Sequence, residues 1–131
     1  MTDPDENAKA ASEKEAEQDA NDQSYYVPND INRFGDVGKD AHDTKKKIFE
    51  YYGAVFEKGA LSQREKALTG LAVAHAVQCP YCIDAYSSSS LEKGASPAQM
   101  TETIHVACAV RGGASLVHGV QLNNHIDKLT M

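Results

Sequence analysis

The motif Cys79-Pro80-Tyr81-Cys82 constrains this chain most, because it joins an apolar segment, residues 68–77, to a second segment with helical spacing. Proline suits the first position of a helix, since its φ is already helical and its missing N–H would have no partner there. This predicts that Cys79 is the N-cap of a helix and that Cys82 lies in the first turn. Free N–H groups and the helix dipole favour thiolate at such a position. We therefore expect a redox-active thiol pair at a helix N-terminus.

Two other interpretations of the pair need fewer assumptions about chemistry. Two cysteines can be half of a metal site, or they can be small buried hydrophobic residues. A zinc site needs two more Cys or His at paired spacing. The chain offers one other cysteine, Cys108, on the apolar face of a predicted helix where we expect a buried thiol. Its five histidines are scattered: His42, His75, His105, His118 and His125. Redox chemistry is favoured, with no metal and no cofactor.

Length and composition exclude several classes of protein. With 131 residues the chain is long enough for one domain, and three cysteines are too few for a secreted disulfide scaffold. No segment reaches the roughly 18 apolar residues of a membrane span. No basic region followed by an apolar stretch opens the chain, as a signal peptide would require. We expect a cytoplasmic protein with no membrane partner.

The negative charge is concentrated at the beginning of the chain. Residues 1–23 contain eight of the 19 acidic residues and two of the 13 basic residues. The remainder of the chain therefore has 11 acidic and 11 basic residues. Residues 1–23 also lack aromatic and β-branched aliphatic side chains, which predicts a disordered acidic tail. The body, residues 24–131, has no basic stripe, so no nucleic-acid partner is expected.

The spacing of apolar residues predicts an all-α body of about five helices. Residues 25–34 place aromatics among Pro, Asn and Gly, which suggests an irregular arm. A helix over 43–58 should end at Gly59. Two capping boxes, residues 62–65 and 96–99, predict helix starts. A helix from the cysteine pair to residue 93 should stop at Gly94, and Gly112-Gly113 should break or bend the chain, or allow close packing, before a last helix over 114–129.

Three segments carry a resemblance to a known family. Arg64-Glu65-Lys66-Ala67-Leu68, Leu71-Ala72-Val73-Ala74 and the run from Cys79 to Ala85 occur in this order. Together they resemble the carboxymuconolactone decarboxylase superfamily, specifically its alkylhydroperoxidase D-like branch, over about residues 45–125. Residues 71–86 and 111–115 are also similar to peroxidase-like members associated with arsenosugar biosynthesis.

The resemblance implies a helical homo-oligomer, from trimer to hexamer, whose CxxC motif reduces hydroperoxides. A dithiol reductant or a lipoyl-type carrier would regenerate the thiols. It also implies that Cys82 attacks the peroxide and becomes a sulfenic acid, while Cys79 donates a proton and then closes the disulfide. The capping argument favours the opposite order, because an N-cap Cys79 should feel the helix terminus more strongly.

The chain departs from the alkylhydroperoxidase D pattern at two positions. A relay glutamate before the motif aligns with Ala67, and a histidine after it aligns with Tyr86. Glu65 is two residues from Ala67, a turn of about 200°, so a capping role is expected for it. His75 shares a helix face with Ala67 and is a candidate base, or a structural histidine. Tyr86 is expected to orient peroxide or carrier, or simply to pack.

Three functions follow from these observations. The favoured one is a thiol-dependent peroxidase with a CxxC dithiol/disulfide cycle. A glutaredoxin is the second, because that family also uses Cys-Pro-Tyr-Cys, although the preceding segment here is helical where that fold needs a strand. A non-enzymatic oligomeric module for redox sensing or metal binding is the third. Lactone decarboxylation is least favoured, since it has no need of paired thiols.

Overall fold

The computed structural model describes residues 25–131 together with residues 9, 12–14 and 17. The tail predicted for residues 1–23 therefore falls almost entirely outside the described residues. The chain divides into two compact units, residues 1–45 and 46–131.

The described part of the first unit contains a 3₁₀ helix, η1 (Pro28–Asp36), where the sequence suggested an irregular arm. Pro28 occupies its first position, and an exposed ion pair joins Arg33 to Asp36 at 3.5 Å. None of its residues is buried.

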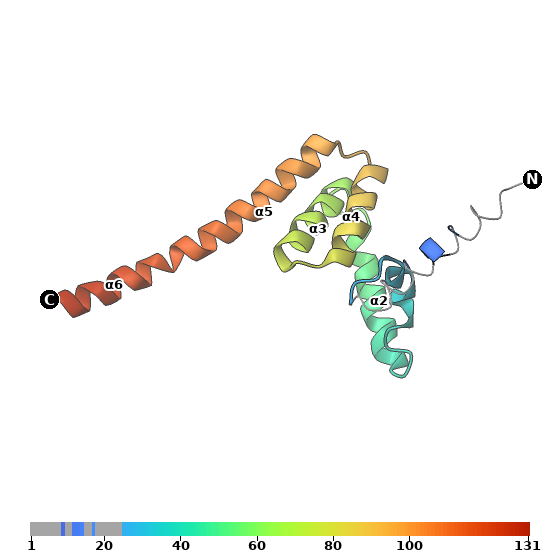
Figure 1. Ribbon diagram of the computed structural model, residues 1–131, viewed down its shortest axis with the longest axis horizontal. Helices are drawn as coiled ribbons and strands as arrows, with labels where there is room; N and C mark the ends of the chain where they lie inside the picture. Colours follow the sequence, from blue (N-terminus) through green and yellow to red (C-terminus); the bar gives the residue numbers. More distant parts are fainter. Residues whose placement is uncertain (1–8, 10–11, 15–16, 18–24) are drawn as a thin grey trace, which may run out of the picture. The chain divides into compact units, whose positions relative to one another are not determined.

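Five α-helices follow, as Figure 1 shows. They are α2 (His42–Phe56), α3 (Gln63–Val77), α4 (Pro80–Glu92), α5 (Pro97–Val117) and α6 (Gly119–Thr130). No strand occurs among the residues that the structure describes. The predicted all-α class is confirmed. None of these helices is both long and apolar enough to cross a membrane.

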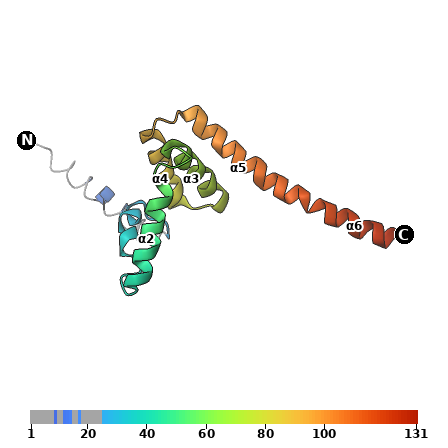
Figure 2. The ribbon, with the colours of Figure 1, turned by 180° about the vertical axis from the view of Figure 1, so that it is seen from behind.

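The core of the second unit is built on α3. Ala67, Leu71 and Ala74 are buried at helical spacing on this helix, and Ala107 of α5 and Ser90 of α4 are buried as well. Small side chains allow α4 and the first half of α5 to approach α3 closely, an arrangement visible from both sides (Figures 1 and 2). The helix that precedes the cysteine pair is thus held firmly in place.

The helix starts follow the predicted capping chemistry. The Ser62 hydroxyl accepts from the Glu65 N–H at 3.2 Å, and the Glu65 carboxylate accepts from the Ser62 N–H at 2.7 Å. Hydrogen bonding of the Glu65 carboxyl to Ser62, first to the side chain and then to the backbone N–H, lowers the pKa of Glu65. Ser96 and Gln99 form the same reciprocal pair at the start of α5. Gly94 adopts φ +80° just after α4, as expected for the residue that ends that helix.

Two predicted helix ends were wrong. Helix α2 ends at Phe56, and Gly59 does not cap it; the Lys66 Nζ instead donates to the carbonyls of Val55 and Glu57. Helix α5 runs through Gly112-Gly113 without a break. Glycine lowers helix stability by about 1 kcal/mol but does not forbid the conformation, and the flanking residues favour it. The break falls at His118, so the last helix begins at Gly119 and not near residue 114.

Candidate functional site

The connection from α3 to α4 places both cysteines. Gln78 has left-handed backbone angles (φ +57°, ψ +47°), and the N–H of Cys79 returns to the Ala74 carbonyl at 3.0 Å. The chain therefore turns sharply after α3, and Cys79 becomes the N-cap of α4 with Pro80 in the first helical position. The cysteine pair lies at a helix N-terminus, as predicted.

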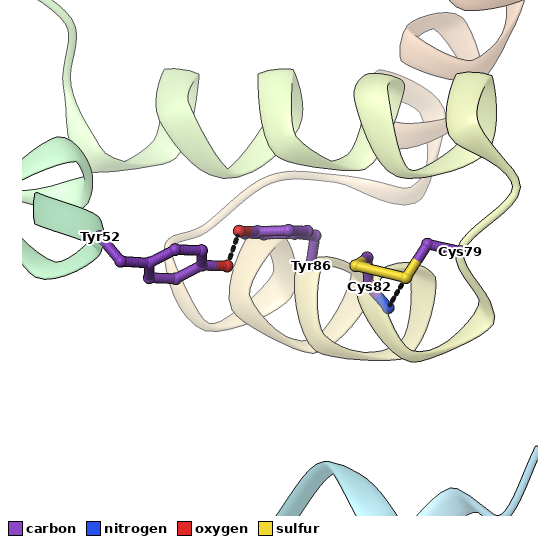
Figure 3. Close-up of a disulfide and its surroundings, with 4 residues drawn as sticks. All are labelled: Tyr52, Cys79, Cys82 and Tyr86. Atoms are coloured by element: carbon purple, nitrogen blue, oxygen red, sulfur yellow. Dashed lines mark hydrogen bonds between the residues drawn. A yellow bond between two sulfur atoms is a disulfide. The ribbon is translucent and has the colours of Figure 1, made fainter. Parts of the chain in front are cut away.

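Cys79 and Cys82 are joined by a disulfide, drawn in Figure 3. Their Cα atoms are 5.3 Å apart, within the usual range for a disulfide. The Cys82 backbone N–H donates to the Cys79 sulfur at 3.3 Å, so the N-cap interaction is made by a sulfur atom. This geometry allows the pair to form a disulfide within one chain.

An open groove of about 690 Å³ lies beside the pair. Cys82 contributes to its wall, whereas Cys79 does not. The remaining lining residues are mostly apolar: Tyr51, Tyr52, Val55, Phe56, Leu61, Lys66, Thr69, Gly70, Val73, Ala74, Val77 and Tyr86. The volume falls within the range of sites that bind small organic molecules. Cys82 is thus the cysteine that a ligand in this groove would meet.

Tyr86 is the aromatic centre of the groove. It follows Cys82 by four residues on α4, and its hydroxyl makes a hydrogen bond with the hydroxyl of Tyr52 from α2 (Figure 3). Its ring stacks on Phe56, with centroids 5.3 Å apart. Burial, followed by the hydrogen bond to Tyr52, raises the pKa of Tyr86 well above its ordinary value of 10.0. The hydroxyl therefore stays protonated at neutral pH.

Gly70 of α3 makes room for this tyrosine. A Cβ at Gly70 would lie 2.8 to 3.0 Å from three ring carbons of Tyr86, closer than side-chain carbons approach one another. The ring can lie against the α3 backbone only because residue 70 has no side chain. Sequence reasoning missed Gly70, Tyr52 and Phe56. A glycine inside an otherwise strong helix was the available signal for the first of them.

His75 lies in the last turn of α3, outside the residues that line the groove. Its Nδ1 is 2.9 Å from the Leu71 carbonyl oxygen, which can only accept, so Nδ1 is the donor in this hydrogen bond. Ala67, at the position of the family glutamate, is a core residue with 1% exposure. A role for His75 as a base stays a prediction.

Cys108 and Arg111 of α5 lie outside the groove lining. The prediction of a buried Cys108 was wrong, because the thiol is exposed in the single chain. Arg111 donates to the Ala76 carbonyl, near the C-terminus of α3. The described residues bring together no group of three or more His, Cys, Asp or Glu that could hold a metal ion.

The fold and the site define a class: a helical protein with a CxxC pair at a helix N-terminus beside an apolar groove. The sequence profile of the carboxymuconolactone decarboxylase family matches residues 42–123, and the chain belongs to this family. The predicted superfamily is confirmed. Helix α3 lies where a glutaredoxin would need a strand, so the fold excludes that alternative.

The chain is also similar to one curated protein and to two solved structures. The "Uncharacterized protein 4 in cox locus" of Paracoccus denitrificans is 44% identical over 75 residues, which are 57% of this chain and 68% of that protein. A crystal structure from Methanobacterium thermoautotrophicum has a TM-score of 0.61 at 25% identity, covering 64% of this chain and 94% of that one. The alkylhydroperoxidase AhpD core from Rhodospirillum rubrum has a TM-score of 0.60 at 24% identity, covering 92% and 88%. The alkylhydroperoxidase D-like fold is confirmed, while the arsenosugar-associated subgroup stays a prediction.

Proposed function

We propose that this protein is a thiol-dependent peroxidase that reduces organic hydroperoxides through the Cys79–Cys82 dithiol/disulfide cycle. One observation carries the proposal: Cys82 faces an apolar groove and can also form a disulfide with its neighbour at a helix N-terminus. Two cysteines with only a packing role would not need a groove beside them. A groove that bound a ligand without redox chemistry would not need two cysteines able to form a disulfide.

The cycle has two steps on the protein. The Cys82 thiolate attacks the terminal oxygen of R–O–OH; the O–O bond breaks, Cys82 becomes a sulfenic acid, and the alkoxide takes a proton to leave as R–OH. The Cys79 sulfur then attacks the Cys82 sulfur, which releases water and forms the disulfide. An external dithiol returns both thiols and is itself oxidised to a disulfide.

The two sulfurs differ in how well each is stabilised as a thiolate and in how easily a ligand in the groove can reach each one. Cys79 receives the N–H of Cys82 and is favoured as a thiolate by the helix terminus. Cys82 is the sulfur beside the groove. We assign peroxide attack to Cys82 because a nucleophile must reach its substrate, and a Cys79 thiolate is well suited to the second step, attack on the sulfenic acid.

The groove also defines the partners that we propose. Its apolar wall favours a hydroperoxide with a hydrocarbon group, and a dithiol reductant or lipoyl-type carrier would reach Cys82 by the same opening. We further propose a homo-oligomer, from trimer to hexamer. A cytoplasmic location stays a prediction from the sequence.

The test uses reduced protein, a short exposure to cumene hydroperoxide, a sulfenic acid trap and mass spectrometry. In Cys79→Ser we expect a trapped sulfenic acid on Cys82; in Cys82→Ser we expect no peroxide-dependent thiol loss beyond the rate of a free small thiol. Cys108→Ser is the matched control and should behave like the unmodified protein. Reversed behaviour of the first two variants would move the attack to Cys79. If the unmodified protein is oxidised by cumene hydroperoxide no faster than a free small thiol, the proposed peroxidase function is wrong. A redox-sensing module would then be the remaining interpretation of the cysteine pair.

A further inference from the structure

The polar groups that line the groove are few, and most are already engaged. The Thr69 hydroxyl donates to the Glu65 carbonyl at 2.8 Å, and the Lys66 Nζ donates to two carbonyls at the end of α2. No carboxylate and no imidazole lies among the lining residues. The phenol hydroxyls are therefore the groups in the groove best able to supply a proton to a bound ligand.

Two of these phenols meet at one point. Tyr52 and Tyr86 are joined through their hydroxyls, and Tyr86 lies on the same helix face as Cys82, one turn later (Figure 3). A phenol O–H turns about its C–O bond, so either hydroxyl can direct its proton to a ligand oxygen while the other supports it. Both hydroxyl-bearing side chains line the same groove as Cys82, and the two hydroxyls meet at the end of the Tyr86 ring that points away from the disulfide (Figure 3).

We propose that Tyr52 and Tyr86 form a proton-donating pair that holds the hydroperoxide against Cys82. This inference rests on the proposed function. When the O–O bond breaks, the terminal oxygen stays on sulfur and the electron pair goes to the other oxygen. A tyrosine hydroxyl donates to this oxygen and transfers its proton, because an alkoxide is more basic than a phenolate; water then returns a proton to the tyrosine.

The surroundings of the pair suit this role. The ring of Tyr86 lies against the α3 backbone at Gly70 and also stacks on the ring of Phe56, and these two contacts restrict the position of its hydroxyl before the peroxide arrives. A donor positioned in advance, in an apolar site, stabilises developing negative charge more than the same donor would in water. The pair would thus supply a proton in a groove whose lining residues include no carboxylate and no imidazole.

The experiment compares two reactions of the same sulfur in Tyr52→Phe, Tyr86→Phe and the double variant. Oxidation of Cys82 by cumene hydroperoxide needs a proton donor, whereas alkylation by iodoacetamide does not. We expect each single variant to slow the oxidation by about 10- to 100-fold, with alkylation unchanged within about twofold, and the double variant to be little slower than Tyr86→Phe. Tyr25→Phe, outside the groove lining, is the control for loss of a tyrosine.

A second measurement tests the hydrogen bond between Tyr52 and Tyr86 in the absence of peroxide. The chain has no tryptophan, so the absorbance change of ionising tyrosine can be followed cleanly during alkaline titration. Tyr52→Phe should lower the pH at which the last tyrosine ionises, because the hydrogen bond to Tyr52 is, after burial, the second cause of the raised pKa of Tyr86. If both Phe variants are oxidised as fast as the unmodified protein, the proposed role of the tyrosine pair is wrong, while the proposed peroxidase function is unaffected. A wild-type rate no faster than that of a free thiol would overturn both, and equal losses in oxidation and alkylation would mean that the tyrosines only pack.

Discussion

At the scale of single residues, Gly70 decides where Tyr86 can lie. Because a Cβ there would meet the ring at 2.8 to 3.0 Å, Gly70→Ala must move the ring or the helix. We expect a net loss of about 1–3 kcal/mol in the free energy of unfolding, the usual cost of overpacking, despite the better helix propensity of alanine. Urea denaturation followed by circular dichroism measures this loss.

Gly53 provides the matched control for this substitution. It is also a helical glycine, but a Cβ added there would meet nothing within 4 Å, so Gly53→Ala should stabilise α2 by up to about 1 kcal/mol. If Gly70→Ala proves as stable as Gly53→Ala, the ring has room to spare and Gly70 does not position it.

At the scale of helices, Lys66 connects the start of α3 to the end of α2. Its ammonium group donates to the carbonyl of Val55, in the last turn of α2, and to the carbonyl of Glu57, just beyond that helix. We expect Lys66→Met to lower the free energy of unfolding by about 1 kcal/mol, since the group is only half-buried and water can replace part of the interaction. Amide hydrogen exchange should speed up in the last turn of α2 and hardly elsewhere.

Lys58 allows the effect of charge to be separated from the effect of capping. It is an exposed lysine in the segment between the two helices, so Lys58→Met removes the same charge from a similar place. Its exchange pattern and stability should stay near those of the unmodified protein. Equal effects from both lysines would show that net charge, and not the hydrogen bonds of Lys66, supports this helix end.

Local chemistry explains why some helix ends could be predicted and others could not. The capping boxes at Ser62 and Ser96, and the N-cap at Cys79, depend on residues within one turn of each other, so the sequence predicts them. The end of α2 depends on Lys66, a residue from the next helix, and no spacing rule reveals it. The groove likewise depends on Tyr52 and Tyr86 meeting across 34 positions of sequence.

At the scale of the whole molecule, few apolar side chains are buried in the core, and many large ones are exposed to solvent. Among the described residues the buried apolar side chains are four alanines and Leu71. Large apolar side chains along α5 and α6 are 57–80% exposed instead: Val106, Val110, Leu116, Val117, Val120, Leu122 and Leu129. Large contiguous exposed apolar patches are typical of interaction sites.

Self-association through α5 and α6 is the prediction that follows. Sedimentation velocity should give a species of several 14.2 kDa chains for the unmodified protein. Replacing Leu116 and Leu122 together by lysine should shift it to monomer, because two charges would be buried without partners in the interface. Ser115→Lys with Asn123→Lys adds the same charges to the same helices at polar positions and should weaken association far less. A monomeric unmodified protein, or equal dissociation by both pairs of substitutions, would show that these apolar side chains do not form the contact between chains.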